Sequence, residues 1–240
     1  LESYYSQWPG VENIRLRAGR DFDRVVLATP VATLPFVASE LLAKSPRWRA
    51  MVEHVQAVPT VSFQLWLRDD LHSLGWKRPP PLLSLYEEPL STWCDMSQVL
   101  PREDWGAGSA PRCVAYFTGA HPGMGAPPPR DDRDYPDRCH AAAKKEAVKF
   151  LQQHVTTLWP AAGSAARTLD WNRLVAPAER AGEARFDSQY WRSNSEPTER
   201  CTLALPGTNR FRLRADATGF ANLTIAGDWI DNGIYAACME

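Results

Sequence analysis

The chain has 240 residues, of which 44% are hydrophobic and 23% charged, and its 27 Lys and Arg against 28 Asp and Glu leave a formal net charge of −1. A chain of this length buries about 70–75% of its unfolded surface, which permits one large domain or two small ones. The balance of charge argues against nucleic acid or an anionic membrane as the main partner. No apolar run approaches the roughly 20 residues that cross a bilayer, and the N-terminal sequence lacks the pattern of a signal peptide.

The five cysteines form no CxxC pair and are odd in number, which predicts neither a disulfide framework nor a zinc ribbon. They are Cys94, Cys113, Cys139, Cys201 and Cys238. The nearby histidines and acidic residues also lack the spacing of metal ligands. We therefore expect a reduced, cytoplasmic protein without a metal centre.

The first half of the chain shows three kinds of pattern. A β-branched apolar run over residues 25–28, which Thr29 and Pro30 end, predicts a short buried strand. Apolar residues at helical spacing predict one helix over 31–44 and a second over 47–55. Clean alternation of apolar and polar residues over 60–68 predicts a half-buried strand.

The second half continues the mixture of strands and helices. Further strands are predicted over 82–86 and 112–118, followed by a proline-rich loop of mixed charge over 121–137. The strongest helical pattern covers 140–159, with Val148, Leu151, Val155 and Leu158 as its apolar stripe. The last apolar strand covers 220–227. The strands at the two ends predict one layer, and the alternating strands of the middle predict another.

The most informative segment directly follows the last predicted strand. Gly227 and Asp228 come first, and small residues after Asn232 and Gly233 predict the start of a helix. Glycine permits close approach of a ligand to the backbone, a carboxylate accepts from ligand hydroxyls, and a helix N-terminus offers free N–H groups. The same residues also suit an ordinary strand–turn–helix in which Asp228 caps the helix, so the residues alone leave both alternatives open.

This segment resembles the C-terminal FAD-binding signature of the flavin-containing amine oxidase and phytoene-desaturase-like oxidoreductases. That signature is a strand, an A-G-D/E motif and a helix resembling M-E-G-A-x-x-S-G, compared here with IAGDW at 225–229 and the residues that follow. The sequence DRVVLATP at 23–30 is similar to the strand by which such chains return from their substrate domain to their FAD domain. The segments 189–194 and 205–207 are similar to a bacterial NAD(P)-binding, amine-oxidase-like branch.

The resemblance implies an α/β (α+β) fold, in which part of an FAD-binding Rossmann-like domain is combined with a mixed-sheet substrate domain. Residues 1–30 would be the return segment and strand of the FAD domain, and 31–219 would form mainly the substrate domain. Residues 220–240 would supply the C-terminal strand and the start of the final helix.

The resemblance also implies roles for individual residues. Asp228 would hold the ribityl or pyrophosphate part of FAD, with Gly227 giving clearance. The other residues implied to bind the cofactor are Thr29, Pro30, Trp229, Ala237, Cys238 and Met239. Of these, 237–239 would direct main-chain N–H groups at the N1 and O2 edge of the flavin. Tyr190 and Trp191 would be walls of the substrate pocket, unless they are plain core aromatics. Cys238 stands where amine oxidases proper often carry a tyrosine of an aromatic cage, which argues against oxidation of primary amines.

The function implied is that of part of an FAD-dependent oxidoreductase. It would transfer a hydride from a C–H bond of a small molecule, next to nitrogen or in an allylic position, to flavin N5. No catalytic residue can be named. Because the chain contains no GxGxxG motif, the resemblance further implies another chain, or an N-terminal half, that carries it. The alternative is a non-catalytic scaffold or interaction subunit that retains the fold and binds no flavin alone.

Overall fold

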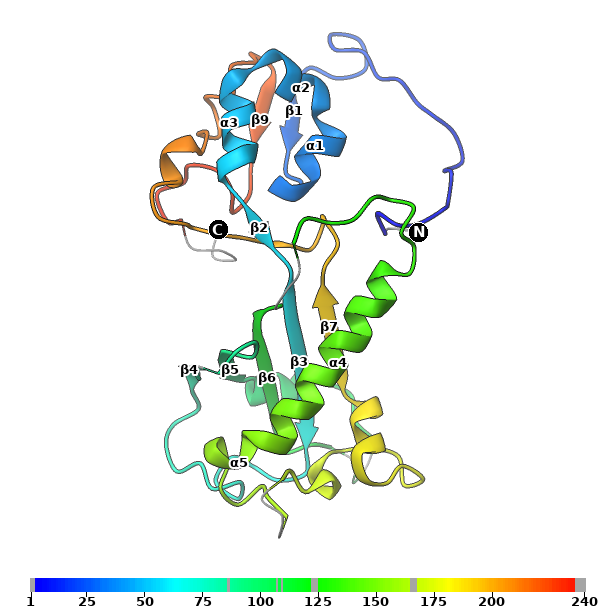
Figure 1. Ribbon diagram of the computed structural model, residues 1–240, viewed down its shortest axis with the longest axis vertical. Coiled ribbons are helices and arrows are strands. Elements are labelled where there is room, and N and C mark those ends of the chain that lie inside the picture. The colour runs from blue at the N-terminus through cyan, green and yellow to red at the C-terminus, as the bar shows by residue number, and fades with distance from the viewer. Residues whose placement is uncertain are drawn as a thin grey trace. The chain divides into compact units, whose positions relative to one another are not determined.

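The computed structural model describes residues 3–85, 87–106, 108, 110–121, 125–164 and 168–235. The chain divides by its internal contacts into two compact units, which are described separately (Figure 1). The first unit comprises Leu1–Pro59, Met124–Arg133 and Ser195–Glu240, and the second comprises Thr60–Gly123 and Asp134–Asn194.

The first unit contains a parallel pair of strands from opposite ends of the sequence. These are β1 (Val25–Leu27) and β9 (Leu223–Ile225), with Leu27 beside Ile225. The pairing joins the two end strands in one layer, as predicted. The prediction that the first of them is buried is wrong, because Val25 is 39% and Val26 66% exposed. A second, antiparallel pair consists of β2 (Ala57–Val58) and β8 (Cys201–Thr202). Neither β2 nor β8 was predicted, because two residues are too few to show a period.

Short helices follow β1. They are η1 (Val31–Thr33), α1 (Leu34–Val37), α2 (Ser39–Lys44) and α3 (Pro46–His54). The prediction of one continuous helix over 31–44 is therefore wrong. Pro35 has no N–H to donate to the carbonyl of Val31, so the α-helical hydrogen bonding starts afresh there. Ala38 then leaves the helical region with a φ of −131°.

The core of the first unit packs these helices against β9 and the turn after it. Trp48 of α3 is fully buried, and its Nε1 donates to the carbonyl of Thr218 over 2.8 Å. The hydroxyl of Thr218 in turn donates to the carbonyl of Leu223 over 2.9 Å. The other buried members of this core are Val31, Leu34, Ala38, Met51, Val55, Leu213, Ile225, Trp229 and Ile230.

The second unit is a five-stranded antiparallel sheet in the order β4-β5-β6-β3-β7. The strands are β3 (Thr60–Leu67), β4 (Leu82–Ser84), β5 (Thr92–Asp95), β6 (Cys113–Ala120) and β7 (Tyr190–Asn194). The long helix α4 (Tyr135–Gln153) lies across one face of the sheet and is followed by α5 (Val155–Leu158) (Figure 1). The chain is therefore a mixed α and β protein, as expected at that level.

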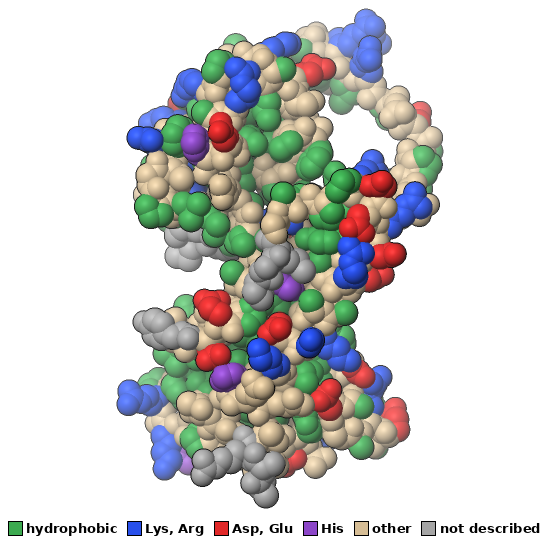
Figure 2. Space-filling view, in the orientation of Figure 1, with side chains coloured by type: hydrophobic (Ala, Val, Ile, Leu, Met, Phe, Trp, Pro, Cys, Tyr) green, Lys and Arg blue, Asp and Glu red, His purple; other side chains and the backbone are tan. Residues whose placement is uncertain are grey.

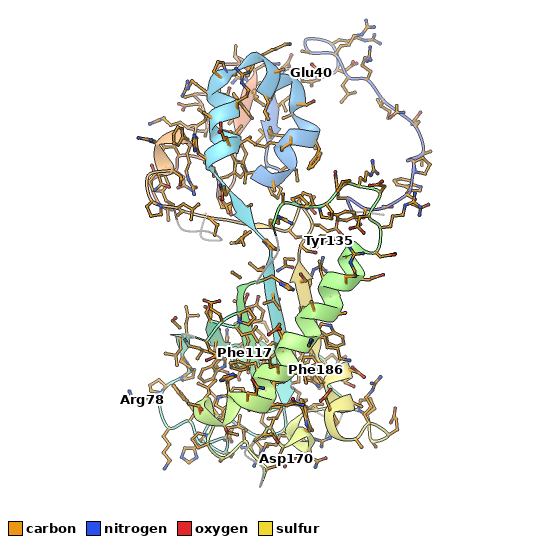
Figure 3. The ribbon with its side chains drawn as sticks, viewed as in Figure 1. Glu40, Arg78, Phe117, Tyr135, Asp170 and Phe186 are labelled. Carbon is orange, nitrogen blue, oxygen red and sulfur yellow. The ribbon has the colours of Figure 1, made fainter. Side chains whose placement is uncertain are left out.

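The core of the second unit fills the space between the sheet and α4. On β3 the predicted apolar face is confirmed, because Val61, Phe63, Leu65 and Leu67 are fully buried. Aromatic rings continue this layer, and Phe117 of β6 stacks on Phe63 at 4.6 Å. Figure 3 labels Phe117 and Phe186, which come from β6 and from η4 (Gly182–Ser188).

The apolar stripe predicted for α4 is only partly correct. Leu151 and Val155 are buried, whereas Val148 and Leu158 are only partly so. The buried stripe of α4 instead begins with three small residues and ends with two large ones. Its members on α4 are Cys139, Ala143, Ala147, Phe150 and Leu151. Acidic and basic side chains are interspersed on the visible side of α4 (Figure 2).

The remaining regular elements are 3₁₀ helices. They are η2 (Ser97–Arg102), η3 (Trp171–Arg173) and η5 (Asn209–Phe211). Among the described residues, every helix is too short or too polar to span a membrane.

Candidate functional site

The candidate site lies in the first unit, where β1 and β9 end side by side. The main-chain N–H of Ala226 donates to the carbonyl of Leu27 over 3.1 Å, which extends the parallel pairing by one residue. Because parallel strands end at the same edge, Thr29 and Pro30 follow β1 at the edge where Gly227 follows β9. The structure thus brings together five of the residues implied by the resemblance, Thr29, Pro30, Gly227, Asp228 and Trp229.

Gly227 is required at the start of this turn for two reasons. Its φ of +136° lies in the region that L side chains rarely adopt. A Cβ there would also lie 2.7 Å from Nε1 of Trp229, whose ring is 1% exposed. The glycine therefore allows the chain to fold back over its own tryptophan, and this part of the signature has a local structural cause.

Asp228 is half-buried and is held from two sides. Its Oδ1 accepts a hydrogen bond of 2.9 Å from the hydroxyl of Thr202 on β8. Its main-chain carbonyl accepts from Nη1 of Arg212. These bonds fix both the carboxylate and the backbone of the turn. Asp228 does not cap a helix, because the residues after it up to 235 form none.

Arg212 is a buried cation beside the turn, with 6% of its surface exposed. Besides Asp228, its guanidinium donates to the carbonyls of Ile230 at 3.5 Å and Leu203 at 3.4 Å. It also lies 5.4 Å from the ring centroid of Tyr235, a cation–π distance. Within the described part of the chain Arg212 forms no ion pair, so a buried positive charge is held by neutral carbonyls alone next to Asp228.

Residues 231–235, after the turn, form a compact loop, and the rest of the helix expected near Asn232 and Gly233 lies outside the described residues. Oδ1 of Asn232 accepts from the N–H groups of Ile234 at 2.9 Å and Tyr235 at 3.3 Å, an Asx-type turn. The hydroxyl of Tyr235 donates to Asp231, and this hydrogen bond raises the pKa of the phenol. Tyr235 has a φ of +54°, and among the described residues it is the only one other than glycine with a positive φ. Backbone strain of this kind clusters at functional sites.

Several buried polar atoms of this region have no hydrogen-bonding partner among the described residues. They are Oγ1 of Thr29, Nε of Arg212, Nε1 of Trp229 and Nδ2 of Asn232. Leaving such a group unpaired costs about 1–3 kcal/mol. A site that keeps several of them suits a ligand rich in oxygen and nitrogen acceptors.

The other residues implied by the resemblance lie elsewhere. Ala237, Cys238 and Met239 fall outside the described residues. Tyr190 and Trp191 belong to the second unit, on β7, where strand alternation puts them on opposite faces of the sheet. Trp191 stacks on Phe186 at 5.3 Å, whereas Tyr190 is 44% exposed.

Three residues of the candidate site were missed from the sequence. Thr202 and Arg212 lie 26 and 16 residues before Asp228 and carry no motif that links them to it. Asn232 and Gly233 are predicted to start a helix, although Asn-Gly is also a common turn signal.

The described residues contain no group of three His, Cys, Asp or Glu side chains that could hold a metal ion. A scan of the sequence against protein-family models finds no match, and a search of the curated proteins finds none either.

Proposed function

We propose that this chain is part of an FAD-dependent oxidoreductase of the amine oxidase and desaturase type, and that the edge after β1 and β9 belongs to its FAD-binding, Rossmann-like domain. The observation that carries the proposal is the set of unpaired buried polar atoms on Thr29, Arg212, Trp229 and Asn232 beside the carboxylate of Asp228. In open α/β sheets, ligands bind outside the carboxyl ends of parallel strands.

The chemistry of the donors fits a flavin dinucleotide. Trp229, Arg212 and Asn232 contribute unpaired N–H donors, and the Thr29 hydroxyl can donate or accept. FAD carries phosphate oxygens, flavin carbonyl oxygens and ring nitrogens that accept, and ribityl and ribose hydroxyls that donate. The carboxylate of Asp228 suits a hydroxyl, and the buried charge of Arg212 favours the anionic portion of the cofactor.

When bound, FAD would supply a hydride acceptor for a C–H bond of a small molecule, next to nitrogen or in an allylic position. The residues of the chain would bind the cofactor and orient it. Asp228, which Thr202 holds in place, would accept a hydrogen bond from a hydroxyl of the cofactor. Gly227 has no side chain, so the cofactor could approach its backbone closely. Trp229 closes the turn against the core and excludes water from its inner side.

Two other parts of the proposal rest on the sequence. The phosphate-binding GxGxxG turn would come from another chain or a further segment, because it is absent from these 240 residues. Tyr190 and Trp191 remain candidate substrate contacts. A cytoplasmic location is proposed as well, and none of the four described cysteines forms a disulfide.

Equilibrium dialysis against FAD tests the proposal on the purified protein together with any chain that co-purifies. Asp228→Asn removes the charge while keeping the shape, and Asp216→Asn is the matched control because Asp216 is an exposed aspartate outside the site. We expect Asp228→Asn to weaken FAD binding by about tenfold or more, the effect of losing one charge-assisted hydrogen bond. Equal affinity in the two variants would contradict the cofactor site, and a wild-type protein that binds no FAD would favour the scaffold alternative.

A further inference from the structure

A small pocket of the first unit lies between α3 and η5. Its volume is about 110 Å³. Because a water molecule in the liquid takes about 30 Å³, the pocket has room for one tetrahedral oxyanion. All of its lining residues belong to one compact unit. They are Arg47 and Ala50 of α3, Arg210 and Phe211 of η5, and the next two residues, Arg212 and Leu213.

The three arginines of this pocket gather without a counter-charge, although the chain as a whole has a net charge of −1. No acidic residue of the described chain lines the pocket, and none of the three arginines forms an ion pair there. Arg47 stands in the first turn of α3, which contains no acidic residue and has no side-chain cap at Ser45. The positive end of the helix adds to the repulsion among the cations, and a bound anion would relieve it.

Arg212 is the buried member of the three, with 6% of its surface exposed. A guanidinium has five N–H donors, and Arg212 uses three of them on the carbonyls of Asp228, Ile230 and Leu203. Nε is one of the two that are left, and it is buried without a partner among the residues that the structure describes. A buried donor without an acceptor is costly, so an anion that accepts from it gains affinity.

Arg210 is exposed at the mouth of the pocket, but its position is restrained. Its guanidinium carbon lies 4.8 Å from the ring centroid of Phe211, a cation–π distance. The ring of His54 stacks on Phe211 at 3.9 Å and thereby holds this wall of the pocket in place. Restrained guanidinium groups match the oxygens of a phosphate group, which they bind through paired N–H donors.

We propose that this pocket binds a terminal phosphate group, either inorganic phosphate or the phosphate of an organic monoester, between Arg47, Arg210 and Arg212. Such a group carries up to about two negative charges near neutral pH and has three or more acceptor oxygens. The proposal shares Arg212 with the proposed flavin site but does not rest on it. Arg47 and Arg210 take no part in that site, and FAD itself carries no terminal phosphate group.

Equilibrium dialysis against radiolabelled inorganic phosphate, at pH 8 and at constant ionic strength in NaCl, tests the proposal. We expect the wild-type protein to bind one phosphate per chain with saturation. Arg47→Gln and Arg210→Gln should each weaken binding by about tenfold, because each removes a charge-assisted hydrogen-bond donor from an exposed position. Arg214→Gln is the matched control, since Arg214 is an exposed arginine of the same segment that pairs with Asp216 and does not line the pocket. A wild-type protein without saturable binding, or equal weakening in the control and the pocket variants, would overturn the proposal.

Competition against the labelled phosphate then identifies the source of the group. Phenyl phosphate carries a terminal phosphate on an organic body, whereas diphenyl phosphate has no terminal phosphate. Phenyl phosphate that binds more tightly than inorganic phosphate would assign the pocket to a monoester, and the reverse order would assign it to the free ion; both results support a terminal phosphate. Diphenyl phosphate that competes as well as phenyl phosphate would contradict it.

Discussion

The hydroxyl of Thr202 lies 2.9 Å from Oδ1 of Asp228 and donates to it, so β8 holds the carboxylate of the turn that follows β9. This contact joins residues 26 positions apart. It restrains the direction of a carboxylate whose residue is only half-buried. In the proposed function, Thr202 is therefore a positioning residue that acts through Asp228.

Replacing Thr202 tests this relationship. Thr202→Val keeps the shape of the side chain and removes the hydroxyl, so we expect a loss of about 1 kcal/mol in the free energy of unfolding. We also expect FAD affinity to fall several-fold, since the carboxylate would no longer be restrained. Thr202→Ser keeps the hydroxyl and should restore most of both. Urea unfolding and FAD dialysis measure the two effects, and the idea fails if valine and serine behave alike.

Gly227 should be intolerant of even one added carbon. In Gly227→Ala, the φ of +136° and the Cβ 2.7 Å from Nε1 of Trp229 act together. Gly207→Ala is a matched control, because Gly207 also has a positive φ of +78° but no atom within 4 Å of the added Cβ. We expect a loss of about 1–2 kcal/mol in the control and roughly 1–3 kcal/mol more at Gly227. Urea midpoints that coincide for the two variants would show that Trp229 does not confine the turn.

Substitutions at two fully buried tryptophans can separate the contribution of hydrogen bonding to stability from that of packing. Nε1 of Trp48 donates to the carbonyl of Thr218, whereas Nε1 of Trp93 has no partner among the described residues. Replacement by phenylalanine removes a similar volume at both positions but leaves a carbonyl unpaired only at Thr218. We therefore expect Trp48→Phe to lower the free energy of unfolding by about 1–3 kcal/mol more than Trp93→Phe does. The opposite order would mean that packing decides.

The pH dependence of stability should contain a contribution from Cys113. Burial raises the pKa of this thiol from 9.0 to about 12. Well below pH 9 the thiol is protonated in both the folded and the unfolded state. Above it the unfolded chain releases the proton first, so stability falls as pH rises from 9 towards 12. Between pH 8 and pH 10 this contribution is a loss of about 1.4 kcal/mol.

Cys113→Ala removes the titrating thiol. The difference in unfolding free energy between pH 8 and pH 10 should therefore be smaller in the variant by about 1.4 kcal/mol. Urea unfolding at the two pH values measures it. A variant with the same pH dependence as the wild type would mean that the folded thiol titrates near its ordinary pKa.

The fold could be predicted from the sequence where a period was long enough to read. The alternation over 60–68 gave β3 with the correct buried face, and the apolar runs at the two ends gave β1 and β9. Shorter elements could not be found, because β2 and β8 have two residues each. The stripe predicted for α4 is only partly correct, because alanine is a weak hydrophobic signal and yet Ala143 and Ala147 are fully buried.

The candidate site could be located only in part. Gly227 and Asp228 stand together in the sequence, but Arg212 and Thr202 reach the turn through tertiary contacts that no local pattern encodes. The conformation of Tyr235 could not be predicted from the local sequence either. Its positive φ and its bond to Asp231 depend on a turn that the sequence presents as the start of a helix.

The visible absorption spectrum of the protein, purified under native conditions with the chains that accompany it, shows whether the protein binds a flavin. We expect flavin absorption bands in the wild-type protein and in Asp216→Asn, and their loss or strong reduction in Asp228→Asn. A colourless wild-type protein that acquires no bands when FAD is added, or an Asp228→Asn protein with its full flavin content, would contradict it.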